Sequence, residues 1–164
     1  MESLSASILP LALLKGLAMM PGGMIAVAAI IAAATASLVA FSVPGAVTPM
    51  SFLSGLMLGI GGILAVALGV LVGSHLLFLV TRRWLGPRMN GRFGPRLEAA
   101  RAHLSRRGPA YVVGARLGGV PHLLVTAACA ATPITARQFL AASLLGMLPA
   151  ISLAAVAGSG VAAI

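Results

Sequence analysis

Carboxylate side chains are almost absent from this sequence. Of its 164 residues only Glu2 and Glu98 are acidic, and neither lies in an apolar stretch. A transporter that binds protons or cations at a carboxylate inside the membrane would have no such group to use here. Acid–base catalysis and metal-assisted hydrolysis are disfavoured for the same reason. We therefore expect no enzymatic activity, no catalytic residue, no metal site and no cofactor.

Cysteine and aromatic residues are also scarce. Cys129 is the only cysteine, so no intrachain disulfide can form. Trp84 and Tyr111 are the only Trp and Tyr, and any aromatic belt at a membrane interface must therefore be thin. The sequence has no CxxC, HExxH, P-loop or GxGxxG pattern, and its three histidines are too widely spaced for a recognisable metal site.

Apolar residues, by contrast, make up 60% of the chain, whereas charged residues make up only 8%. A soluble domain carries roughly 25% charged residues, so too few polar side chains are present to cover a surface that faces water. We predict an all-α integral membrane protein with several embedded helices. Residues 24–43, 63–81 and 137–157 are each long and apolar enough to form a membrane-crossing helix.

The N-terminal segment differs from these stretches, because its apolar run is short and Lys15 interrupts it. We predict an interfacial segment over residues 1–23, followed by a single transmembrane domain over residues 24–164. The alternative is a signal peptide, with Lys15 in its positive region and Ala34–Ala36 as the small-residue cleavage site.

Two further apolar segments, residues 44–62 and 110–133, are interrupted by glycine and proline. Each fits a re-entrant hairpin, and the first tip is expected near Pro49. Such backbone is tolerated at membrane depth only where protein or a wet cavity covers it. Broken segments in corresponding positions of two halves indicate an inverted repeat with a site near the midplane. The expected structural breaks are Pro44, Pro49, Gly55, Gly59, Gly118, Gly119, Pro121 and Pro149.

Basic residues are concentrated between Arg82 and Arg116. Such a cluster can indicate nucleic-acid binding, but a soluble nucleic-acid binder has no use for apolar runs on both sides of it. We expect no nucleic-acid partner. Lys and Arg collect in cytoplasmic loops and attract anionic lipid head groups. Residues 82–107 are therefore predicted to be cytoplasmic.

This basic segment contains a helical pattern, because Phe93, Leu97, Ala100 and Leu104 recur at helical spacing. Pro95 can start such a helix. A surface amphipathic helix and a solvated loop both fit it. For the topology, we expect the first span to run outward from the cytoplasm and the second span to return. The last span then leaves the C-terminus outside.

Arg116 is the residue best placed to carry chemistry. It lies in a glycine-flanked apolar stretch, where a charge is costly and usually faces a wet cavity or a bundle interior. Its guanidinium matches phosphate oxygens bidentately. The alternative is an anchor that reaches the cytoplasmic head groups. His122 follows Pro121 at the expected hairpin tip, where it could also be an ordinary polar turn residue. His75, inside a span, fits a buried neutral histidine.

Small residues four positions apart allow helices to approach closely. They would serve packing within one chain or a homo-oligomer contact equally well. Three such pairs occur: Gly55/Gly59, Gly69/Gly73 and Gly114/Gly118.

Several stretches together resemble a known family: Pro44–Pro49, Phe78–Gly86, Ala115–Pro121, Thr132–Phe139 and Leu144–Pro149. The chain is similar, over about residues 40–160, to the VTT domain, also called SNARE-associated, of the DedA superfamily. Within this superfamily, the chain most resembles the bacterial branch that is similar to the yeast vacuolar Golgi-trafficking protein.

The resemblance implies two facing re-entrant hairpins in a multi-pass protein of the bacterial inner membrane. It also implies translocation or scrambling of an anionic lipid, either a phospholipid or a polyprenyl phosphate. Carried over by position, Arg116 and either Arg82 or Arg83 match family arginines, and with His122 they are the expected lipid-phosphate residues. The first hairpin lacks acidic residues, so proton coupling is not implied. A lipid-binding scaffold and a small-solute or ion transporter are the alternatives.

Overall fold

The computed structural model describes residues 13, 16, 19–92, 108–132 and 134–162, and the regular structure of these residues is all helical. The predicted all-α class is therefore confirmed. In chain order the elements are α2 (Gly23–Ala40), α3 (Val47–Leu58), the 3-10 turn η1 (Gly59–Gly61), α4 (Gly62–Arg92), a helix over residues 108–117, α6 (His122–Ala130) and α7 (Ala136–Ala162).

Three stretches of the described chain are long and apolar enough to cross a membrane. They are Gly23–Ala40, Val47–Trp84, which joins α3, η1 and most of α4, and Ala136–Ala162. The chain is thus a multi-pass membrane protein by the length and composition of its helices.

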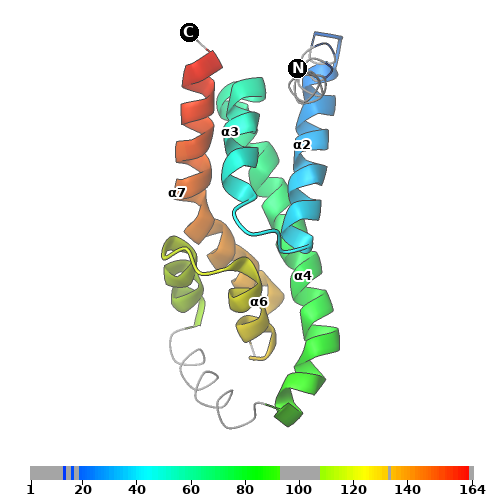
Figure 1. The fold of residues 1–164 in the computed structure, drawn as a ribbon, viewed down its shortest axis with the longest axis vertical. Coiled ribbons are helices and arrows are strands. Elements are labelled where there is room, and N and C mark those ends of the chain that lie inside the picture. Colours follow the sequence, from blue (N-terminus) through cyan, green and yellow to red (C-terminus); the bar gives the residue numbers. More distant parts are fainter. Residues whose placement is uncertain (1–12, 14–15, 17–18, 93–107, 133, 163–164) are drawn as a thin grey trace, which may run out of the picture.

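The helices form two hairpins, each followed by a long helix (Figure 1). α2 starts at the end of the molecule where α7 finishes, and α3 turns back toward that end before α4 runs to the opposite end. There the helix over residues 108–117 and α6 form a second hairpin, and α7 returns. The hairpin turns, residues 41–46 and 118–121, both lie near the middle of the long axis.

α2 and α4 run in the same direction, which corrects the expected topology. Gly69 of α4 packs against Ala32 of α2, and Gly73 packs against Ala36. Because the contacts advance in step along both helices, the helices are parallel. The first two predicted spans were expected to be antiparallel, and this was wrong because the chain already reverses between α2 and α3. These two glycines serve packing within the chain.

Three expected breaks lie inside helices. Pro49 is in the first turn of α3, where its missing N–H removes no intrahelical bond. Gly55 is inside the same helix, and a Cβ there would overlap the Ala155 carbonyl of α7, so it permits close packing. Pro149 lies inside α7, which continues on both sides of it. The first hairpin tip is therefore at residues 41–46, not at Pro49.

The basic segment begins as helix, because α4 continues to Arg92. The amphipathic pattern that follows it, residues 93–107, lies outside the described residues, as does most of the predicted interfacial segment 1–23.

Candidate functional site

The first hairpin turn is built by the way α2 ends. The Val43 amide donates to the Leu38 carbonyl at 2.9 Å, and the Ser42 amide donates to the Val39 carbonyl at 2.9 Å. Ser42 has a φ of 56°, the left-handed conformation that this pair of bonds requires. Pro44 follows and cannot continue the helix. The result is a Schellman motif that reverses the chain.

The second hairpin turn repeats this geometry. The Val120 amide donates to the Ala115 carbonyl at 3.0 Å, and the Gly119 amide donates to the Arg116 carbonyl at 3.3 Å. Gly119 has a φ of 72°, and Pro121 follows. The tripeptides Ser-Val-Pro and Gly-Val-Pro therefore occupy the same positions in the two turns.

The long helices repeat a contact as well. A Cβ at Gly73 of α4 would meet Ala36 and Val39, and a Cβ at Gly146 of α7 would meet Val113 and Arg116. Val39 and Arg116 stand at equivalent positions of the two Schellman motifs. Each half of the chain is thus a hairpin packed on a glycine of the long helix that follows it, and the two hairpins point toward each other (Figure 1).

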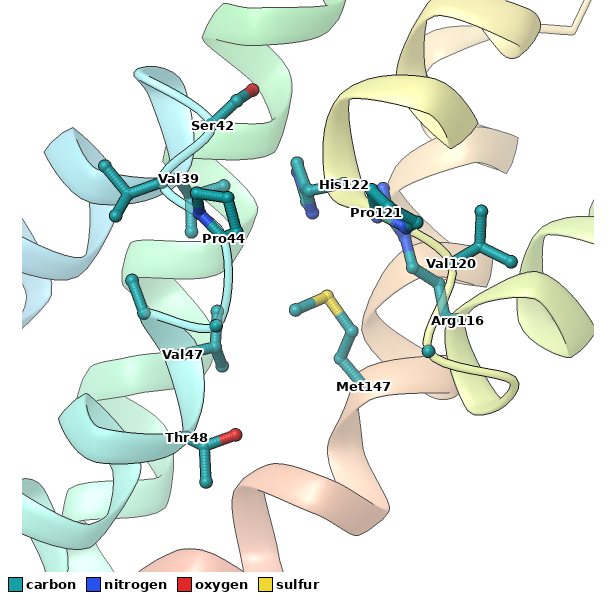
Figure 2. Close-up of a pocket in the computed structure, with 14 residues that line it drawn as sticks. Val39, Ser42, Pro44, Val47, Thr48, Arg116, Val120, Pro121, His122 and Met147 are labelled. Atoms are coloured by element: carbon teal, nitrogen blue, oxygen red, sulfur yellow. The ribbon is translucent and has the colours of Figure 1, made fainter.

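A pocket of about 260 Å³ lies between the two turns. Figure 2 shows the first turn on one side of it and the second turn on the other, with Met147 of α7 between them. Its lining comes from Val39 and residues 42–48 on the first side, and from Arg116 and residues 119–122 on the second.

Arg116 brings the charge to this pocket. Its side chain is only 9% exposed. The Nη2 group donates to Thr126 Oγ1 of α6 at 3.4 Å, and Cζ lies 5.9 Å from the centroid of the Phe139 ring. The Nε atom is buried and has no hydrogen-bond partner among the described residues. The guanidinium is thus only partly satisfied, and its buried Nε is unpaired within the described chain.

Arg116 ends a row of stacked side chains. Phe139 stacks on Phe78 with centroids 4.8 Å apart, and Arg82 Cζ lies 5.6 Å from the Phe78 centroid. Arg82 also donates to the Ile134 carbonyl at 3.2 Å. Two cations therefore cover the outer faces of one aromatic pair, which fixes the rings that face Arg116.

The other expected site residues divide between the pocket and the surface. His122 lines the pocket, and its Nε2 lies 3.3 Å from Ser74 Oγ of α4. Arg82 and Arg83 are exposed and are not among the lining residues. His75 is also outside the pocket, and its Nδ1 has no partner among the described residues.

Ser42 was not among the predicted site residues, although its side chain belongs to the site. It lines the pocket, and its Oγ is buried without a partner in the described chain. Val39 and Met147 were missed as well. The one sequence signal for Ser42 is the match between Ser42-Val43-Pro44 and Gly119-Val120-Pro121.

Two facing hairpins, long apolar helices and a pocket with one buried cation define a polytopic α-helical membrane protein. The family model of the VTT domain matches residues 43–160, so the chain belongs to this family, which is of the DedA, or SNARE-associated, type. Comparison with curated proteins and with solved structures finds no match.

Proposed function

We propose that this protein translocates or scrambles an anionic lipid, and that the lipid head group enters the pocket between the two hairpin turns. One observation carries the proposal: Arg116, a cation that is only 9% exposed, lines that pocket, and its buried Nε is unpaired within the described chain. A phosphate head group in the pocket supplies oxygens that suit a guanidinium.

The chain has few acidic residues that could act as a counter-ion for Arg116. A cation inside an apolar segment costs about 2.5–3.5 kcal/mol on insertion scales. The sequence holds only two acidic residues, Glu2 and Glu98, and neither is among the described residues. In a bilayer, the anion at hand is a lipid phosphate. The same scarcity of carboxylates favours movement of lipid without coupling to protons.

The lengths of the short helices support a site at membrane depth. α3 has 12 residues and α6 has 9, so they are about 18 and 14 Å long, well short of the roughly 30 Å hydrocarbon core. With the long axis along the membrane normal, both hairpins are re-entrant and their turns meet near the midplane. Irregular backbone at that depth is stable where it lines a cavity.

The proposed setting is a bacterial inner membrane with the basic segment 82–107 on the cytoplasmic side. Arg82 and Arg83, exposed toward the end of α4, are suited to anionic head groups at that surface. Lipids would then collect at the membrane face before a head group enters the pocket.

The test is translocation in proteoliposomes of phosphatidylcholine that carry a trace of fluorescent phosphatidylglycerol. The parent should speed the exchange of label between leaflets, and Arg116→Ala should lose most of this effect. Arg137→Ala is the matched control, because it removes an exposed charge from α7 away from the pocket. Binding of lipid without exchange would favour the scaffold, and exchange by Arg116→Ala equal to that by the parent would overturn the proposed site.

A further inference from the structure

A second cavity adjoins the pocket of Arg116. It has a volume of about 350 Å³ and is lined by Ala110, Tyr111, Gly114, Ala115 and Val120. Val120 lines both cavities. We call this second cavity the side groove.

We propose that the side groove holds an acyl chain of the same lipid whose phosphate binds Arg116. This inference rests on the proposed function and specifies its substrate as a whole lipid phosphate, recognised by head group and chain together. Free phosphate would fill only the first pocket.

The shared lining residue Val120 places the two cavities next to each other, which suits a single amphiphilic ligand. Ala115, in the side groove, directly precedes Arg116, in the pocket. The hydrogen bond from the Val120 amide to the Ala115 carbonyl, 3.0 Å long, holds the shared wall in place. A ligand with its anion at Arg116 therefore has an adjoining cavity for its chain.

The composition of the side groove fits a hydrocarbon chain. Among the residues that the structure describes, its lining carries no ionisable group other than the Tyr111 phenol. A Cβ at Gly114 would meet nothing within 4 Å, so this glycine leaves open space where a larger residue would fill the groove. The sign of a ligand in the adjoining pocket is the one on which the proposed function rests: the unpaired Nε of Arg116, a residue that is only 9% exposed.

The experiment uses photocrosslinking in phosphatidylcholine nanodiscs with a trace of phosphatidic acid that carries a diazirine on one acyl chain. Mass spectrometry should locate crosslinks at residues 110–120 of the parent. Gly114→Leu should lower them about tenfold, and Arg116→Ala should lower them as well. Gly160→Leu is the matched control, because Gly160 is also helical, exposed and open to a Cβ, but lies near the end of α7.

Gly114→Ala, which adds one methyl group, should fold and crosslink nearly as the parent does, and elution as a single peak in gel filtration checks each variant. Crosslinks that Gly114→Leu leaves unchanged, or crosslinks spread evenly over the apolar surface, would overturn the side groove. Crosslinks that Arg116→Ala leaves at the parent level would also overturn it, because the proposal places the phosphate of the same lipid at Arg116.

The same preparations, assayed for lipid exchange, separate this inference from the proposed function. Exchange at the parent rate by Gly114→Leu would contradict the side groove and leave the proposed function standing. If the parent crosslinks in the side groove but moves no lipid, translocation is contradicted. The side groove would then still be an acyl-chain site, as in a lipid-binding scaffold.

Discussion

At the residue scale, the position of Arg116 results from three local features. It is the second-last residue of its helix, which Gly119 closes with a Schellman motif. Thr126 accepts one hydrogen bond from it, and Phe139 covers its guanidinium. The sequence indicated Arg116 and His122 correctly as neighbours of one turn. The sequence did not show that Arg82 lies outside the pocket. An arginine near a membrane span gives the same sequence pattern whether its side chain lines a pocket or, like Arg82, donates to a backbone carbonyl.

Phe139→Leu tests the aromatic support of Arg116. Leucine keeps an apolar core but removes the ring face, and a cation–π contact is worth about 0.5–2 kcal/mol. We expect lipid exchange to fall by a factor of roughly 2–30, the equivalent of that energy. Phe52→Leu, at a partly exposed position of α3, is the control. Equal exchange by the two variants in proteoliposomes would show that the ring does not position Arg116.

At the element scale, composition and segment length were enough to predict an all-helical membrane protein. The tip of the first hairpin was placed wrongly at Pro49, because a proline in the first turn of a helix reads like a break but disturbs nothing. The true turn depends on Ser42 in a left-handed conformation, which serine rarely adopts. Segment length also does not tell whether an 18-residue helix such as α2 crosses or turns back.

Ser42→Gly should stabilise the protein. Glycine adopts the left-handed conformation without the cost of roughly 1–2 kcal/mol that a Cβ brings, and the change removes a buried hydroxyl that is unpaired in the described chain. We expect a higher midpoint of thermal unfolding in detergent. Ser37→Gly, at an exposed interior position of α2, should lower it, because glycine costs about 0.5–1 kcal/mol inside a helix. Shifts of the same sign in both variants would contradict the assignment of the turn.

At the scale of the whole molecule, the two halves repeat the same hairpin geometry, but of the described residues only Arg116, in the second half, places a cation in the lining of the pocket. Val39 and Arg116 hold equivalent positions, and both line the pocket. The sequences of the two halves are too dissimilar to establish this relation. The relation consists of equivalent backbone hydrogen bonds and equivalent glycine contacts, which are made by different amino acids in the two halves.

The relation between the halves predicts that the charge can be moved. Arg116→Val alone should abolish lipid exchange, and the double variant Val39→Arg/Arg116→Val should recover part of it, because the new guanidinium enters the same pocket from the opposite turn. Recovery is expected to be partial, since Val39 is 3% exposed and packs on Gly73. A folded double variant no more active than Arg116→Val would argue against equivalent positions.

The arrangement of the helices predicts which ends share a side of the membrane. On a Cys129→Ala background, Met20→Cys and Gly160→Cys should react with an impermeant maleimide from the same side, because α2 begins where α7 ends (Figure 1). Gln138→Cys, at the start of α7, should react from the other side. Labelling of Met20→Cys and Gln138→Cys from one common side would instead support the topology expected from the sequence.

The most direct test of the central claim is lipid exchange by Arg116→Lys, compared with the parent and with Arg116→Ala at matched membrane abundance. Lysine keeps the positive charge but loses the planar fork of donors that pairs with phosphate oxygens. If Arg116 binds a lipid phosphate in the pocket, the lysine variant should recover only part of the parent exchange, and the alanine variant should recover least. If Arg116 only anchors the topology, lysine should restore exchange in full, and equal rates for Arg116→Lys and the parent would contradict the account.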